Sequence, residues 1–166
     1  MNVVLVLDNI RSAFNVGSIF RTADGLGFDI NLIGITPIPD QDKKLDKTSL
    51  SSLDYVKWEY FNNSENWVEN VRSIEGEMLI ISIEEGQNLK TISLFELENE
   101  ISAIKKFKNI YLVFGHEING VSKYIQDKSD FILKIPMYGK KNSLNVATCA
   151  GIVGYRFKEL LNNRNI

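Results

Sequence analysis

The stretch Ile110-Tyr111-Leu112-Val113-Phe114-Gly115-His116-Glu117 runs from consecutive apolar residues into a glycine and a carboxylate. A short apolar run that a glycine ends predicts a β-strand buried on both faces. Similar runs predict strands at residues 3–7, 30–33, 56–61, 78–83 and 131–135. Segments with helical spacing lie between and after them, at residues 16–26, 65–74, 94–107 and 144–162, and a short turn is predicted at 121–127. This alternation predicts an α/β fold: a mostly parallel sheet of about six strands with helices on both faces.

Length and composition favour one ordinary soluble domain over residues 1–166, because 44% of the 166 residues are hydrophobic and 24% are charged. The apolar run at 3–7 is interrupted by Asp8, and no run approaches the ~20 residues that cross a bilayer. We therefore expect a cytoplasmic protein with no membrane contact. One cysteine, Cys149, and one histidine, His116, exclude an intramolecular disulfide and the usual zinc cage, so we expect no metal.

Charge is distributed unevenly along the chain. Residues 1–100 hold 8 Lys and Arg against 17 Asp and Glu, whereas residues 101–166 hold 11 against 4. The basic C-terminal part is compatible with a phosphate-binding surface and equally with scattered, solvated lysines, so charge alone leaves both interpretations open.

Candidate functional residues follow the predicted strands, because ligands of parallel sheets bind at the carboxyl ends of the strands. After the first strand, Asn15 occupies a position suited to a helix N-cap, and Gly17 allows close approach of a backbone or a phosphate. Arg21 follows on the same predicted helix. Alone, this pattern is also that of a capped helix with a surface arginine.

The segment after the fifth predicted strand places Gly115 and Glu117 at a strand end, where the glycine can present bare backbone to a ligand. Glu117 is suited to binding an amine, positioning a cation such as Arg21, or capping the next turn. His116 has no assignable partner, so we do not assign it the role of general base.

After the sixth predicted strand, Pro136 ends the ladder, and either Ser143 or Asn145 is the N-cap of the last helix, which leaves the other to bind a ligand. Small residues at Ala147, Gly151 and Gly154 share one face of that helix. They predict close packing, either on the sheet or on a second subunit.

Together these segments resemble the three signature motifs of the TrmH (SpoU) branch of the SPOUT superfamily, in family order: Asn15-x-Gly17-x-x-x-Arg21, Phe114-Gly115-x-Glu117-x-x-Gly120-Val121-Ser122, and Ile135-Pro136-Met137 with Ser143-Leu144-Asn145-Val146-Ala147. The resemblance implies an α/β sheet with a C-terminal deep trefoil knot and a homodimer. It also implies transfer of a methyl group from S-adenosylmethionine to a ribose 2′-hydroxyl of tRNA or rRNA.

Residue roles carried over by the resemblance fall into two sets. Those implied for catalysis and substrate positioning are Asn15, Arg21, Glu117, Ser143 and Asn145. Those implied for cofactor binding are Ile83, Glu84, Gly115, Ile135, Met137, Ser143 and Leu144. Because a guanidinium is hardly ever deprotonated, we expect Arg21 to bind the phosphate or the developing alkoxide rather than to act as a base.

Several relatives of this type carry an RNA-binding extension, and none is expected in these 166 residues. Substrate RNA would then be selected by the domain surface, the second subunit or a separate RNA-recruiting protein. The alternatives are a base-nitrogen methyltransferase of a related SPOUT branch, an inactive RNA- or nucleotide-binding module, and a dinucleotide enzyme. The last is disfavoured because no Gly-x-Gly-x-x-Gly follows the first strand.

Overall fold

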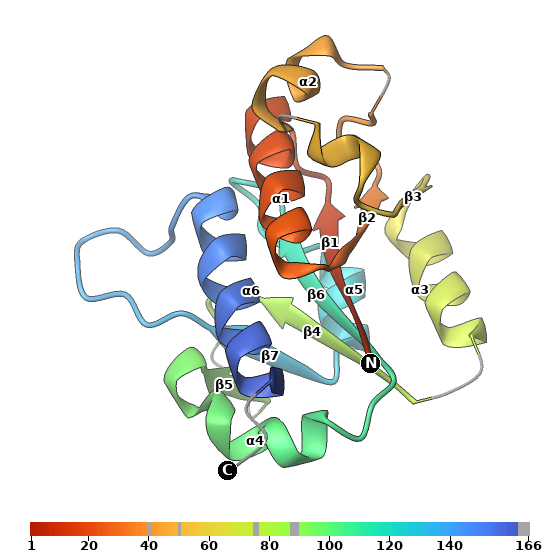
Figure 1. The fold of residues 1–166 in the computed structure, drawn as a ribbon. Coiled ribbons are helices and arrows are strands. Elements are labelled where there is room, and N and C mark those ends of the chain that lie inside the picture. Colours follow the sequence, from red (N-terminus) through yellow and green to blue (C-terminus); the bar gives the residue numbers. More distant parts are fainter. Residues whose placement is uncertain (40, 50, 75–76, 87–89, 163–166) are drawn as a thin grey trace.

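The computed structural model describes residues 1–39, 41–49, 51–74, 77–86 and 90–162. They form a parallel sheet of seven strands in the order β3-β2-β1-β6-β4-β7-β5 (Figure 1). The strands are β1 (Asn2–Asp8), β2 (Asp29–Ile33), β3 (Trp58–Phe61), β4 (Met78–Ile83), β5 (Thr91–Ser93), β6 (Asn109–Gly115) and β7 (Phe131–Lys134). The predicted α/β fold with a parallel sheet is confirmed.

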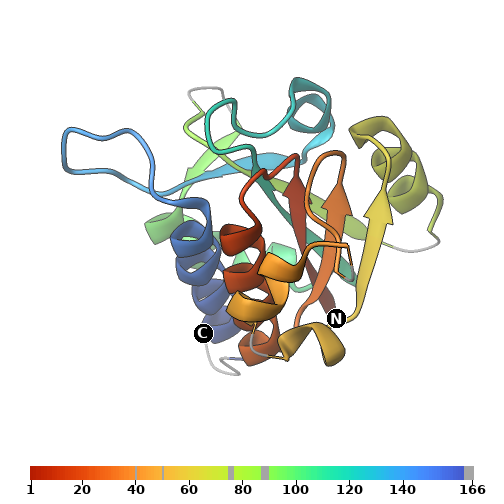
Figure 2. The same ribbon diagram turned by 90° about the horizontal axis from the view of Figure 1, so that it is seen from above.

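Helices cover both faces of the sheet, as Figure 2 shows. One face carries α1 (Ala13–Leu26), α2 (Lys43–Ser49), α4 (Leu97–Ile104) and α6 (Val146–Asn162); the other carries α3 (Ser64–Ser73) and α5 (Lys123–Lys128). Two short 3-10 turns, η1 (Ser52–Asp54) and η2 (Leu94–Glu96), complete the described elements. Alternate side chains of β1 enter the two cores: Leu5 and Leu7 pack under α1 and α6, whereas Val4 and Val6 pack under α3.

The path of the chain changes direction beside the centre of the sheet. From β1 the chain builds outward through β2 and β3, and it then crosses to the other side of β1, where β6 lies in register with Asp8 opposite Gly115. Strands β4, β6 and β7 end near each other at the same edge. An open parallel sheet binds its ligands in the crevice outside strand ends at such a reversal.

All six predicted strands are present, although β3 begins at Trp58 rather than at residue 56. Strand β5 and helix α2 were not predicted. The predicted helix 94–107 is divided into η2 and α4 and ends at Ile104, and the last helix begins at Val146 rather than at residue 144.

The start of α1 differs from the prediction. Ser12, not Asn15, is the N-cap, because its hydroxyl accepts a hydrogen bond from the Asn15 backbone N–H at 3.3 Å. Asn15 therefore lies inside the first turn, and its side chain is available for another partner. A Cβ on Gly17 would come within 2.8 Å of the Thr48 Cβ, so the close neighbour of this glycine is α2.

Candidate active site

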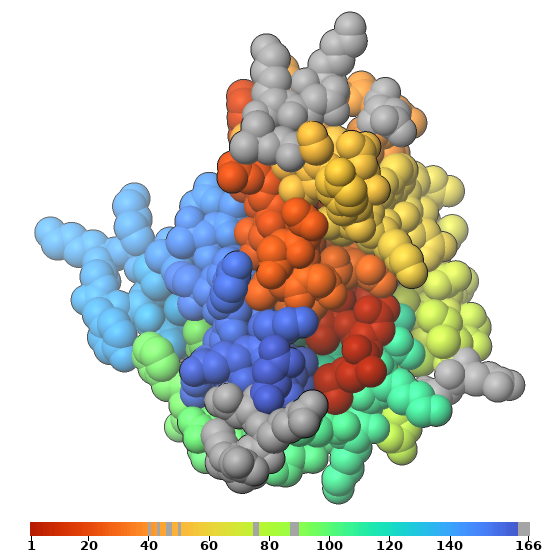
Figure 3. Space-filling model, in the orientation of Figure 1, coloured from red at the N-terminus to blue at the C-terminus, as the bar shows by residue number. Residues whose placement is uncertain are grey.

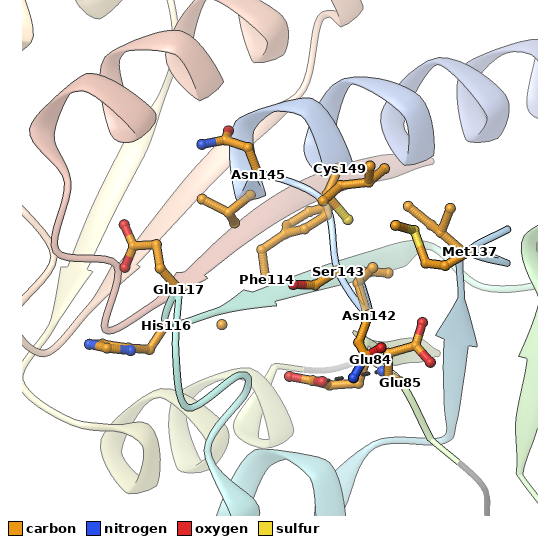
Figure 4. A pocket seen from close by; sticks show the side chains of 15 residues that line it. Glu84, Glu85, Phe114, His116, Glu117, Met137, Asn142, Ser143, Asn145 and Cys149 are labelled. Carbon is orange, nitrogen blue, oxygen red and sulfur yellow. Dashed lines mark hydrogen bonds between the residues drawn. The ribbon is translucent and has the colours of Figure 1, made fainter. Parts of the chain in front are cut away.

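A cleft lies at the carboxyl ends of β4, β6 and β7, beside the start of α6 (Figure 4). Its cavity volume is about 200 Å³, and it is partly open to solvent. The residues that line it come from four separate parts of the chain: Ile83, Glu84, Glu85, Phe114, Gly115, His116, Glu117, Ile135, Met137, Asn142, Ser143, Leu144, Asn145, Val146 and Cys149. All seven residues predicted for cofactor binding are among them.

Glu117 fastens the β6 end of the cleft to the loop before α1. Its Oε1 accepts hydrogen bonds from the Ser12 backbone N–H and from Asn15 Nδ2, both at 3.1 Å, and its Oε2 accepts one from the Arg11 N–H at 3.2 Å. Partial burial alone would raise the pKa of Glu117. Hydrogen bonds from its own amide, from Arg11 and Ser12, and from Asn15 outweigh burial and hold that pKa below its ordinary value. Glu117 is thus an ionised anchor and a poor proton acceptor.

Asn15 and Asn145 extend this network to the last helix. Asn145 Nδ2 donates to Asn15 Oδ1 at 3.1 Å, and Asn145 Oδ1 accepts from the backbone N–H of Ala147 at 2.9 Å. Asn145 is therefore the N-cap of α6, which resolves the choice between Ser143 and Asn145. Ser143 lines the cleft instead. The hydrogen bonds of Asn15 to Glu117 and Asn145 join the first motif segment to the other two at its rim.

Gly115 lies against the loop that follows it. A Cβ on Gly115 would stand 2.0 Å from both the Gly120 carbonyl carbon and the Val121 nitrogen, so the bare face expected to meet a ligand meets this loop instead. Glu84 Oε1 holds the same loop by accepting from the Val121 N–H at 2.6 Å. Gly115 thus lines the cleft with its backbone atoms while its Cβ position faces the loop.

Asp8, at the end of β1, is a second anchor that the sequence analysis did not single out. Its carboxylate is fully buried and accepts from the Ser122 N–H at 2.7 Å, Asn9 Nδ2 at 2.9 Å and Ser64 Oγ at 3.3 Å. A carboxylate directly after a strand of a parallel sheet is the signal that identifies it. Asp8 and Glu84 together fix the loop around residues 120–122 against the sheet.

Two of the five predicted catalytic residues, Asn15 and Arg21, do not line the cleft. Asn15 is hydrogen-bonded to Glu117 and Asn145, which do line it. Arg21 lies apart from this network. It is exposed on α1, six residues beyond Asn15, and the described residues include no salt-bridge partner for it. His116 lines the cleft, but its Nδ1 accepts from the backbone N–H groups of Ile118 and Asn119 at 3.0 and 3.2 Å. The Nδ1 atom of His116 therefore stabilises the turn at residues 116–119.

Cys149 of α6 forms part of the wall of the cleft. Burial and, to a smaller extent, the nearby charge of Glu84 raise the pKa of its thiol to about 12. The group is protonated at neutral pH and is a weak nucleophile. Glu85 and Asn142 also line the cleft and lie outside the motifs, whereas Phe114 and Val146 belong to the motifs but were assigned no role.

Small residues on α6 divide between two environments. A Cβ on Gly154 would lie 2.5 Å from Leu26 Cδ1 of α1, so this glycine permits close helix–helix packing within the domain. At Gly151 nothing lies within 4 Å. The predicted close packing thus holds for Gly154 inside the chain, whereas the Gly151 position faces outward.

Two features are absent from the described ranges. Those ranges hold no group of three or more His, Cys, Asp and Glu side chains able to bind a metal ion. They also hold no helix that is both long and apolar enough to span a membrane.

Residues 2–155 match the SpoU rRNA Methylase family. The chain belongs to this family. A SpoU relative from Borreliella burgdorferi, named as an uncharacterized tRNA/rRNA methyltransferase, is 30% identical over 96% of this chain. This chain spans 64% of that relative's length.

Solved structures share the SpoU fold seen here. One, described as giving insights into the 2-OH methylation of C/U34 on tRNA, has a TM-score of 0.80 at 26% identity and covers 98% of this chain and 97% of its own. The SpoU methyltransferase AviRb from Streptomyces viridochromogenes, described in complex with AdoMet, has a TM-score of 0.77 at 23% identity; the match covers 95% of this chain and 57% of AviRb.

Proposed function

We propose that this protein transfers a methyl group from S-adenosylmethionine to a ribose 2′-hydroxyl of tRNA or rRNA. One observation carries the proposal: the three motif segments, separated by up to 130 residues, meet at one cleft through the hydrogen bonds Glu117–Asn15 and Asn15–Asn145. Family membership and the tRNA 2-OH methylation described for a 26% identical structure support the same activity.

The cleft fits S-adenosylmethionine. Ile83, Phe114, Ile135 and Leu144 line the cleft and supply apolar surface for a purine. The backbone N–H groups of Met137, Asn142, Ser143 and Leu144, which line the cleft, donate to no other described residue, so they are available to the edge of an adenine ring. A site of mostly apolar surface with a few placed donors is typical for such a ligand.

In this reaction the protein mainly aligns the ribose hydroxyl with the methyl group and forms no covalent bond to either. When bound, S-adenosylmethionine supplies a methyl carbon already activated by its sulfonium. The ribose O2′ attacks that carbon while the carbon–sulfur bond breaks, sulfur leaves as a neutral thioether, and the hydroxyl proton passes to a phosphate oxygen or water. Glu117 keeps its charge in this step because its oxygens are occupied by three donors.

Asn145, Ser143 and Asn15 are the residues we assign to orienting the ribose. Asn145 has its orientation set from two sides, by the α6 backbone and by Asn15. Its amide is therefore held in one direction at the rim of the cleft before substrate arrives, which is the pre-organisation that positioning demands. The Ser143 hydroxyl lines the cleft beside it.

A homodimer supplies Arg21 in our proposal. Helices α1 and α6 lie side by side (Figure 1), and they expose Phe14 at 58%, Ile152 at 41% and Tyr155 at 59%. Arg21 lies seven residues from Phe14, hence on the same face of α1. Isologous pairing across this surface would cover these apolar side chains and direct Arg21 to the substrate phosphate or alkoxide in the partner subunit's cleft.

Labelled methyl transfer into RNA from cells that lack this protein tests the proposal. Wild-type protein should transfer the label, and Asn145→Ala should reduce the single-turnover rate by about 100-fold, or ~2.7 kcal/mol of transition-state stabilisation. Asn119→Ala is the matched control, since that exposed side chain does not line the cleft. Absence of transfer, together with no heat on titration with S-adenosylmethionine or its demethylated product, would reject the proposal.

A further inference from the structure

The segment between β7 and α6 projects from the domain beside the cleft. Figure 3 shows it as a light blue extension from the surface, and Figures 1 and 2 show the same loop standing away from the sheet. At its tip Tyr138 is 87% exposed, and nothing lies within 4 Å of the place where a Cβ on Gly139 would be. The tip is thus free of contact with the rest of the described chain.

The base of this loop is part of the cleft. Three residues at the base of the loop line the cavity (Figure 4). Met137 lies where the chain leaves the domain, and Asn142 and Ser143 lie where it returns. Tyr138, Lys140 and Lys141 lie on the segment that connects these lining residues, so they adjoin the cleft. When one nucleotide of an RNA chain enters the cleft, the neighbouring nucleotides of that chain come within reach of these side chains.

The tip combines an aromatic ring with uncompensated positive charge. Lys140 and Lys141 are exposed, and neither forms an ion pair with a described residue. The nearby Lys134 differs, because it pairs with Glu85 at 3.1 Å. Residues 135–145 contain no Asp or Glu. An exposed ring beside free ammonium groups is the combination that binds an unstacked base and its phosphates.

We propose that residues 138–141 bind single-stranded RNA next to the methylated nucleotide, with Tyr138 stacked on an unpaired base and Lys140 and Lys141 on adjacent phosphates. The inference rests on the proposed function and narrows its substrate class to unpaired RNA. A duplex is disfavoured because its bases are stacked on one another and offer no free face to Tyr138.

Binding of a labelled oligouridylate and of a blunt RNA duplex of the same length tests this inference. Tyr138→Ala should weaken oligouridylate binding about tenfold, since stacking contributes roughly 1–3 kcal/mol per base, whereas Tyr138→Phe should bind like wild type. Lys140→Ala with Lys141→Ala should reduce the slope of log K against log salt by about 1.4, because each single-strand phosphate contact contributes ~0.7. Duplex binding should be weaker and insensitive to Tyr138.

The matched control replaces Lys106 and Lys108, two exposed lysines near the amino end of β6, at the edge of the sheet opposite the cleft. This pair should leave the affinity for oligouridylate within about twofold of wild type, because these lysines lie far from the proposed path of the strand. Wild-type affinity in Tyr138→Ala, equal dependence on both lysine pairs, or a loss of dimer in Tyr138→Ala would overturn the inference.

Methyl transfer and calorimetry separate this inference from the proposed function. If wild type binds S-adenosylmethionine and methylates RNA while the loop variants bind RNA normally, only the loop assignment fails. If wild type does neither, the proposed function fails, whatever the loop binds.

Discussion

Replacement of Gly115 by alanine is the change that most directly probes how the cleft is built. The added Cβ would stand 2.0 Å from the Gly120 carbonyl carbon and the Val121 nitrogen, whereas ordinary contacts begin at 3.4 Å. The loop would have to retreat by about 1.4 Å, the difference between these distances. Both neighbours are backbone atoms, so no side-chain rotation can relieve the overlap.

The cost follows from two hydrogen bonds that the retreat would break. They run from the Val121 N–H to Glu84 and from the Ser122 N–H to the buried Asp8. A hydrogen bond to a charged group contributes about 1.5–3 kcal/mol, so Gly115→Ala should lower the free energy of unfolding by about 3 kcal/mol or more. For a domain of this size that is a fall in melting temperature of about 6–12 °C.

Differential scanning calorimetry and titration with S-adenosylmethionine measure both consequences of Gly115→Ala. We expect the lower melting temperature together with an affinity reduced about tenfold or more, because Gly115 and Glu84, which hold the displaced loop, both line the cleft. Gly139→Ala is the control, since a Cβ there meets nothing within 4 Å. A Gly115→Ala protein that melts within about 2 °C of wild type and binds the cofactor normally would refute the reasoning.

Three further predictions concern individual side chains. Arg21→Ala and Asn145→Ala should each be inactive. Dimers re-formed from an equal mixture of the two variants should regain about a quarter of wild-type activity, because half of the dimers are mixed and each mixed dimer has one intact site of two. No recovery of activity would contradict supply of Arg21 by the partner subunit. Hydrogen bonds outweigh burial and lower the pKa of Glu117, so its ionised form stabilises the fold at a pH above the ordinary pKa of about 4.3. This stabilisation is lost as the pH falls through the lowered pKa. Glu117→Gln should therefore make the melting temperature fall less steeply at acid pH, and an unchanged fall would contradict this. With its pKa raised to about 12, Cys149 should react with an aromatic disulfide at about pH 8 far more slowly than a free cysteine does, and rapid stoichiometric labelling would count against the assignment.

The sheet could be predicted because its strands are buried on both faces. Continuous apolar runs such as that of β6 have few other interpretations in a chain of this length. Strand β5 escaped prediction because Thr-Ile-Ser is too short to show a pattern. Helix α2 escaped because, among its described side chains, Leu45 is the only apolar one that it buries.

The cleft was predictable where motifs name residues and less so where partners lie far apart in the sequence. Ser12 and Asn15 are both good capping residues, and the choice between them depends on Glu117, 102 residues beyond Asn15, which takes the Asn15 side chain. Asp8 and the true neighbour of Gly115 likewise depend on contacts across the sheet. The trefoil knot and a separate RNA-recruiting protein stay predictions.

The identity of the methylated nucleoside tests the central claim most directly. RNA from cells lacking this protein would be incubated with the purified protein and isotope-labelled S-adenosylmethionine, digested to nucleosides and analysed by mass spectrometry. We predict a labelled methyl group on ribose, and an adjacent phosphodiester that resists alkali because the 2′-oxygen is blocked. Label on a base with an unmodified ribose, or no label in RNA, would contradict the account.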